Sequence, residues 1–319
     1  MIRKLFYISF ILIFGCNNEK SSKEEIAINI TKTDYTKYVN PFIGTSKMGH
    51  VFPGATAPFG MVQLSPQTNF EPMFYDDTSY NTETYEYCAG YQYKDSTIIG
   101  FTHTNFSGTG HSDLGDFLVM PTTGNLVLDP LKTKKGSKGF YSNFSHDKEE
   151  ASPGYYKVTL DSYNIKAELT SSERVGFHKY TFPESSESRI IIDLGEGSAD
   201  RPTDTYLRQI NDTLFEGYRF SSGWASDQRE FFSLVVSKPV NDFMIYNNGR
   251  KVKASEKKGE FLKGFLEFST KKGEVIYLKM GVSPVSSSNG LDNLMTEIPG
   301  WDFNKVLKDA EDKWNKELS

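Results

Sequence analysis

The chain has 319 residues, a formal net charge of −5 and 24% charged residues, which is ordinary for a globular protein of one large or two small domains. No basic stripe runs along a face, so the composition argues against a nucleic-acid-binding surface. Aromatic residues make up 14% of the chain, and this content, together with many Thr, Val and Gly, favours sheet over helix.

The N-terminus has the pattern of an export signal. Two basic residues precede an apolar run at 5–14, which is too short for a permanent membrane-spanning helix. The sequence IFGC, ending at Cys16, is similar to a bacterial lipobox, in which the cysteine is lipidated and becomes the mature N-terminus. We predict a lipoprotein signal peptide at 1–15, lipidation at Cys16 and a polar tether at 16–33. The protein is then expected to be exported and anchored to the cell envelope, at the outer membrane, the cell surface or in the periplasm.

From residue 35 to 286 the chain keeps one pattern. Short apolar or alternating segments, such as VGFHKYTF at 175–182 and EVIYLKMGVS at 274–283, are separated by turn sequences such as NNG at 247–249. Regular strands at this spacing predict an all-β fold, a large antiparallel β-sandwich at 35–286.

The stretch at 91–123 carries the residues most typical of a site. A β-type run leads into a Gly/Ser/Thr loop at 107–110, and a second apolar run follows. Near the loop lie two histidines and two carboxylates, namely His103, His111, Asp113 and Asp116. Glycine allows the backbone to approach a ligand closely, and imidazoles and carboxylates beside such a loop are typical of binding or catalytic sites.

Three interpretations of this stretch stay open from the residues alone. The polar side chains can form a ligand site, or they can simply hydrogen-bond one another in a loop between two strands. A metal site formed by His103, His111 and Asp113 is the third interpretation, but their spacing matches no recognised ligand motif.

The last segment differs from the strands before it. At 302–318 apolar residues recur along one face at helical spacing, and Asp302 is placed to cap the helix. We predict a linker at 287–319 that contains an amphipathic helix at 302–318. Such a helix either lies on the sandwich or begins a helical domain.

Six segments, in the same order, resemble the N-terminal domain of glycoside hydrolase family 92. They are YVNPFIGT at 38–45, FPGATAPFGMVQLSP at 52–66, the stretch at 88–124, and the segments at 144–160, 165–183 and 221–239. The resemblance covers about residues 35–319. It implies a β-sandwich joined by a helical linker to a C-terminal (α/α)6 barrel.

The activity implied by the resemblance is that of an exo-acting, inverting, Ca²⁺-dependent α-mannosidase. In that family the general acid, the general base and most calcium ligands belong to the barrel. We therefore expect no catalytic residue in this chain, which looks truncated before the barrel, and no activity from this fragment alone. Its expected partners are mannose-containing glycans, its own C-terminal domain and, through the lipid anchor, a membrane.

The resemblance also suggests which residues bind substrate. The family's Gly-Trp-Asp aligns with 84–86, and its SGTGCGD aligns with SGTGHSD at 107–113, so His111 and Ser112 stand where the family has Cys and Gly. We predict these substrate-binding residues: Tyr85, Glu86, His103, Ser107, Gly108, His111 and Asp113. Asp116 is predicted to brace the loop.

Two questions stay open at this point. Two departures from the family, Thr84-Tyr85-Glu86 in place of Gly-Trp-Asp and His111 with Ser112 in place of Cys and Gly, leave the linkage undecided between α-1,2 and α-1,3 or another α linkage. The alternative function is a non-catalytic, surface glycan-binding lipoprotein that consists of the sandwich alone.

Overall fold

The computed structural model describes residues 33–68, 82–111, 113–130, 139–195 and 200–319. The signal peptide at 1–15, the lipidation site Cys16 and almost all of the tether at 16–33 lie outside these ranges and stay predictions. Within the described ranges, no helix has the length and apolar character needed to cross a membrane.

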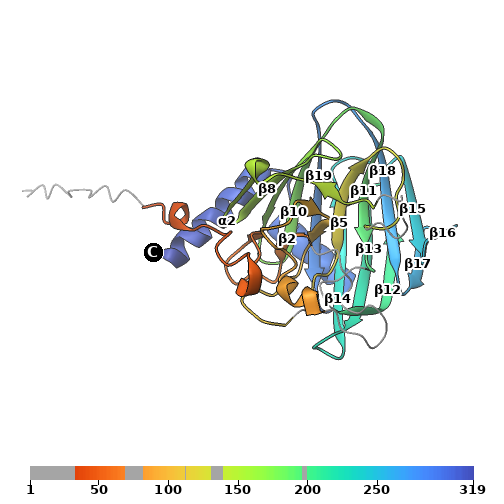
Figure 1. The fold of residues 1–319 in the computed structure, drawn as a ribbon. Helices are drawn as coiled ribbons and strands as arrows, with labels where there is room; N and C mark the ends of the chain where they lie inside the picture. Colours follow the sequence, from red (N-terminus) through yellow and green to blue (C-terminus); the bar gives the residue numbers. More distant parts are fainter. Residues whose placement is uncertain (1–32, 69–81, 112, 131–138, 196–199) are drawn as a thin grey trace, which may run out of the picture. The chain divides into compact units, whose positions relative to one another are not determined.

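Two large antiparallel sheets enclose the main core (Figure 1). The first has eight strands in the order β1-β2-β4-β5-β11-β18-β15-β16. These strands are β1 Ala55–Thr56, β2 Gln63–Gln67, β4 Gly100–Thr102, β5 Leu118–Thr123, β11 Ser185–Asp193, β15 Asp242–Asn247, β16 Arg250–Val252 and β18 Leu262–Thr270.

The second sheet has nine strands in the order β17-β12-β13-β14-β19-β10-β9-β8-β7. They are β7 Glu149–Ser152, β8 Tyr155–Leu160, β9 Ile165–Ser171, β10 Val175–Phe182, β12 Arg201–Gln209, β13 Leu214–Ser222, β14 Gln228–Val236, β17 Glu256–Gly259 and β19 Glu274–Ser283. A separate small pair joins β3 Thr97–Ile98 to β6 Ser142–Asn143.

Strand alternation explains how the sequence forms this core. Along β13, side chains alternate between half-buried and buried from Leu214 to Ser221, which is the period of two expected of a strand with one covered face. Phe215 therefore enters the core, and Arg219 points to the same inner face with no exposed surface. The prediction of a large antiparallel β-sandwich is confirmed.

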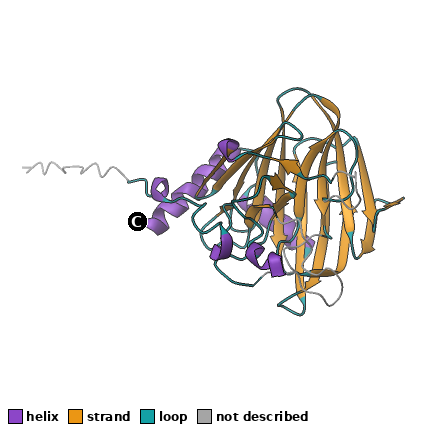
Figure 2. Ribbon diagram, viewed as in Figure 1, coloured by secondary structure: helices purple, strands orange, loops and turns teal. Residues whose placement is uncertain are grey.

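In the described part of the chain, the two α-helices are the last elements, and four short 3-10 turns precede them; Figure 2 draws helices in purple. They are α1 Ser287–Glu297 and α2 Phe303–Leu318, and the short 3-10 turns are η1 Thr36–Tyr38, η2 Lys47–Gly49, η3 Thr82–Tyr87 and η4 His146–Lys148. Helix α2 matches the predicted helix, and the Asp302 carboxylate accepts the N–H of Lys305 at 3.0 Å, as a cap does.

Helix α2 lies on the sandwich. The indole Nε1 of Trp314 donates to the carbonyl of Thr56 at 2.6 Å. A Cβ at Gly154 would lie 2.9 Å from Cβ of Ala310, so glycine is needed for this close approach. The apolar stripe that the sequence predicted thus has a partner inside this chain.

Helix α1 was not predicted, because it packs through backbone rather than through an apolar stripe. A Cβ on Gly281 of β19 would lie only 2.0 Å from the carbonyl oxygen of Gly290 in α1. Leu294 and Ile298 then join Val175 and Phe303 in a second apolar cluster. Both helices therefore cover the outer face of the nine-stranded sheet.

Candidate functional site

The loop at 107–115 joins β4 to β5 and is tied to its surroundings through backbone. The N–H of Gly108 donates to the carbonyl of His50 at 2.6 Å, and the N–H of Gly115 donates to the carbonyl of Thr104 at 2.8 Å. Gly108 has φ of +73°, a conformation that glycine adopts without strain. Ser107 and Gly108 are exposed at the tip.

A buried ion network holds the base of this loop. The Arg219 guanidinium donates to Asp116 at 2.6 Å and to Asp200 at 2.7 Å, and none of the three side chains is exposed. Burial lowers the pKa of Arg219, but the two carboxylates raise it by a larger amount. The net shift of the pKa is upward, so the arginine stays charged. Thr104 also donates to Asp116, at 2.7 Å. Every one of these contacts places Asp116 in a bracing position.

Glu230 lies beside this network and was not singled out from the sequence. It is directly opposite Arg219 in the β13–β14 pairing, but the guanidinium is already bound to Asp116 and Asp200. Burial, and then the nearby Asp116 charge, raise the pKa of Glu230 to about 8, and its Oε2 has no partner among the described residues. The sequence could have indicated Glu230 only through its position, since it is a carboxylate on the inward face of an alternating strand.

Asp113 connects the loop to the turn between β13 and β14. Its carboxylate accepts the N–H of Leu114 at 3.1 Å and the N–H of Ala225 at 3.3 Å. A Cβ on Gly223 would lie 2.6 Å from its Oδ1. Asp113 is only 3% exposed, and burial raises its pKa. Asp113 was predicted to bind substrate; in the structure its oxygens position two loops.

His103, also predicted to bind substrate, lies between the sheets with no exposed surface. Its Nδ1 contacts the carbonyl of Phe117 at 2.8 Å, and its Nε2 lies 3.0 Å from Nε2 of His178, whose Nδ1 contacts the Tyr180 hydroxyl at 2.6 Å. A carbonyl can only accept, so His103 Nδ1 carries a proton and donates to the Phe117 carbonyl. His103 Nε2 then accepts from His178 Nε2–H, and His178 Nδ1 accepts from the Tyr180 O–H. Burial lowers the pKa of His103 to about 4, so the ring is neutral.

Two ring pairs lie beside Gly110, and we call them the ring cluster: His50 with Tyr85, which approach Gly110 itself, and His111, the next residue, with Trp224. His50 and Tyr85 meet edge to face at 5.2 Å between ring centroids, and His111 lies 4.2 Å from Trp224. A Cβ on Gly110 would lie 2.3 Å from the Tyr85 hydroxyl. Hence the structure places the Tyr85 hydroxyl against the residue before His111, and it pairs each of these two predicted residues with a ring that the sequence did not point out.

Two imidazole nitrogens of the ring cluster are unsatisfied. His50 Nε2 and His111 Nδ1 are buried and have no hydrogen-bond partner among the described residues. An unpaired buried polar group costs about 1–3 kcal/mol, so a ligand hydroxyl or a water is the natural partner. Glu86, by contrast, is paired with Lys94 beside the cluster.

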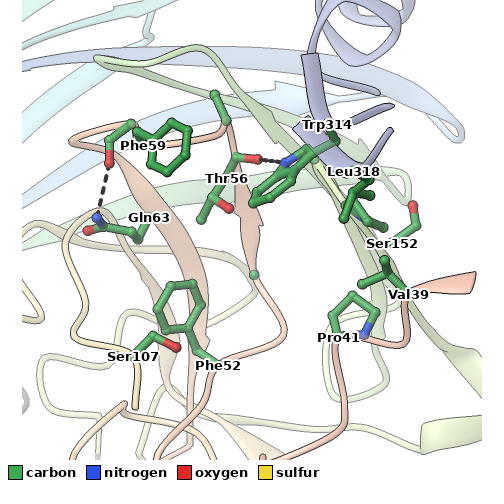
Figure 3. Close-up of a pocket in the computed structure, with 15 residues that line it drawn as sticks. Val39, Pro41, Phe52, Thr56, Phe59, Gln63, Ser107, Ser152, Trp314 and Leu318 are labelled. Carbon is green, nitrogen blue, oxygen red and sulfur yellow. Dashed lines mark hydrogen bonds between the residues drawn. The ribbon is translucent and has the colours of Figure 1, made fainter. Parts of the chain in front are cut away.

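A cavity of about 340 Å³ opens beside Ser107 (Figure 3). Its walls come from the N-terminal segment, the β1 region and the end of α2, and are mostly apolar. The lining residues labelled in the figure include Val39, Pro41, Phe52, Phe59, Trp314 and Leu318. Ser107 is the member of the predicted site that reaches it.

The residues of this loop do not fit a metal ion. Calcium takes six to eight oxygen ligands, whereas the oxygens of Asp113 and Asp116 already accept bonds from protein donors. Across the part of the chain that the structure describes, no group of three or more His, Cys, Asp or Glu side chains could hold a metal. The interpretation as a site of His103, His111 and Asp113 also fails, because both His103 nitrogens are occupied.

Comparisons with known proteins agree on one relationship. The pattern of the glycosyl hydrolase family 92 N-terminal domain matches residues 38–283. The structure of the family GH92 α-mannosidase BT3965 from Bacteroides thetaiotaomicron, in complex with mannoimidazole, is 37% identical with a TM-score of 0.82, covering 89% of this chain and 37% of that one.

Two further relatives are more distant. An uncharacterized secreted glycosidase of Arthroderma benhamiae is 27% identical over 312 residues, which is 89% of this chain and 38% of that protein. The inverting mannosidase BT2199 from B. thetaiotaomicron, at 22% identity and a TM-score of 0.74, shares the fold over 89% of this chain and 36% of its own. The chain therefore spans less than two fifths of the length of these relatives.

Proposed function

Because the chain belongs to glycoside hydrolase family 92 through its N-terminal domain, we propose that it is the pocket-contributing part of an exo-acting, inverting, Ca²⁺-dependent α-mannosidase. The observation that supports a sugar site in this domain is the ring cluster, in which Tyr85 packs on His50 and His111 packs on Trp224 beside Gly110. Aromatic rings with a few polar groups among them are what a sugar site needs.

The chemistry divides between two domains in this proposal. Inversion requires a general acid on the leaving oxygen and a general base that activates water, with the two carboxyl groups about 6.5–9.5 Å apart. Asp113 and Asp116 do not suit these roles, because both are bound to protein donors. We assign the acid and the base to a C-terminal (α/α)6 domain, and to this chain the binding and orientation of terminal mannose.

Calcium is proposed to bind in that C-terminal domain, where it would grip sugar hydroxyls through hard oxygen coordination. The protein expressed from the full reading frame should release mannose from α-linked mannobioses. A chelator should abolish release, and added Ca²⁺ should restore it. Failure to release mannose from any α linkage would refute the proposed activity. Full activity in the presence of chelator would refute only the calcium requirement.

The linkage is proposed to depend on His111 and Ser112, where the sequence departs from the family's SGTGCGD, together with Tyr85 and Glu86, where it departs from Gly-Trp-Asp. The same assay on α-1,2-, α-1,3- and α-1,6-mannobiose ranks the linkages. His111→Cys restores the family residue and should change the ranking. An unchanged ranking would show that His111 does not determine the linkage specificity.

Anchoring through Cys16 completes the proposal. Export is supported by the Arthroderma relative, which is described as a secreted glycosidase, and the sequence before Cys16 supports lipidation. Cys16→Ser should release the protein from the membrane fraction into the soluble fraction. Equal membrane retention of both proteins would exclude this anchor.

A second function is favoured by one observation: the ring cluster is complete within this chain. A non-catalytic, surface glycan-binding lipoprotein would need nothing more. The two functions are separated by the same mannobioses, since a binding protein retains them without releasing mannose.

A further inference from the structure

Trp224 is exposed to solvent at the turn between β13 and β14. Its side chain is 65% exposed, whereas the other two tryptophans, Trp301 just before α2 and Trp314 within α2, are half-buried. A single exposed apolar side chain is ordinary on a protein surface. What sets Trp224 apart is that its position is fixed.

Three contacts fix Trp224. Its ring packs on His111, with 4.2 Å between ring centroids. The N–H of the next residue, Ala225, donates to the buried Asp113 carboxylate. The preceding residue, Gly223, has no room for a side chain, because a Cβ would lie 2.8 Å from Cβ of Asp200. An exposed indole on a braced turn loses little entropy when a ligand stacks on it.

His111 supplies polar atoms beside this face. The ring is half-buried, and it makes no hydrogen bond to another described residue, with Nδ1 buried and unpaired. An imidazole nitrogen can accept or donate a bond to a hydroxyl. The pair therefore offers an apolar face and an unpaired hydrogen-bonding group side by side.

We propose that Trp224 and His111 form a platform for a pyranose ring of a mannose-containing glycan, in addition to the contacts of Tyr85. The indole face covers the apolar C–H face of the sugar, and the imidazole bonds one of its hydroxyls. This inference rests on the proposed function, because that function supplies the sugar as ligand. A sugar suits the pair better than an apolar peptide does, since a peptide side chain would leave the imidazole unpaired.

Four variants of the full-length protein test the platform. Trp224→Ala removes the stacking face, Trp224→Phe keeps a smaller one, and His111→Phe keeps a ring but removes its nitrogens. Tyr38→Ala is the matched control, since Tyr38 is a 73% exposed aromatic outside the ring cluster. Direct binding is measured by calorimetry with a non-hydrolysable analogue of α-linked mannobiose that has sulfur in place of the glycosidic oxygen, and KM and kcat are measured by mannose release from mannobiose.

We expect Trp224→Ala to raise Kd and KM about tenfold or more, which is about 1.4 kcal/mol, with a smaller change in kcat. Trp224→Phe and His111→Phe should each weaken binding less, and Tyr38→Ala should leave it unchanged. Unchanged Kd and KM in Trp224→Ala would overturn the platform while the mannosidase function stands. A drop in melting temperature with unchanged Kd would overturn it too, and would mark Trp224 as a packing contact with another domain. Absence of mannoside binding by the unmodified protein would overturn the proposed function together with the platform.

Discussion

The clearest quantitative expectation concerns the proton on Glu230. Its pKa rises from 4.5 to about 8 in the folded protein, first through burial and then through Asp116. Between those two pH values the folded state holds a proton that the unfolded state has released. Stability therefore falls as pH rises through this window, by up to about 1.4 kcal/mol per pH unit. Below pH 4.5 both states are protonated, and above pH 8 both are ionised.

The magnitude follows from the width of the window. A rise of that size corresponds to at most about 5 kcal/mol of stability lost by pH 9. Relaxation around the ionised carboxylate reduces the measurable effect, so we expect about 2–3 kcal/mol. Glu230→Gln has a similar shape and no charge, so it should match the unmodified chain near pH 5 and exceed it near pH 9.

Urea unfolding between pH 5 and pH 9 measures this difference. The control is Glu187→Gln, the same substitution at a side chain that is 54% exposed, which should leave the pH dependence unchanged. If Glu230→Gln and the unmodified chain lose stability in parallel between pH 5 and pH 9, the proton is not on Glu230 and the reasoning is refuted.

Two further predictions concern buried contacts. Arg219→Met leaves the carboxylates of Asp116 and Asp200 buried without a counter-charge, so unfolding free energy should fall by about 3–5 kcal/mol in urea titrations; a loss under 1 kcal/mol would contradict the network. Gly290→Ala places a Cβ 2.7 Å from the carbonyl oxygen of Gly281, so α1 should move away from the sheet. Its backbone amides should then exchange hydrogen at least tenfold faster. Unchanged exchange would show that the contact relaxes easily and would contradict this prediction.

Local patterns were sufficient for most of the fold. Alternation in segments such as 175–182 predicted strands, and the strand β10 is found there. The helix at 302–318 was predicted from its apolar stripe and from Asp302, and both the helix and the cap are present. These features depend on neighbours a few residues apart, which the sequence displays directly.

Helix α1 and the role of His103 could not be obtained in this way. The helix is held by the close approach of Gly290 to Gly281, and a glycine carries no apolar signal. His103 stood in a motif rich in site-like residues, so it was assigned to substrate. Its direction was in fact set by the strand β4 before it, since it lies two positions after Phe101 and points into the same core.

What the sequence determined by itself is the family, the strands and the chemistry available in the loop at 107–116. Tertiary structure alone decided which of those groups are free and what they meet. Trp224 reaches His111 across more than a hundred residues, and Arg219 reaches Asp116 across 103. Such pairs depend on the order and register of strands in two sheets. Periodicity shows which way a side chain points, but it carries no information about which distant strand becomes its neighbour.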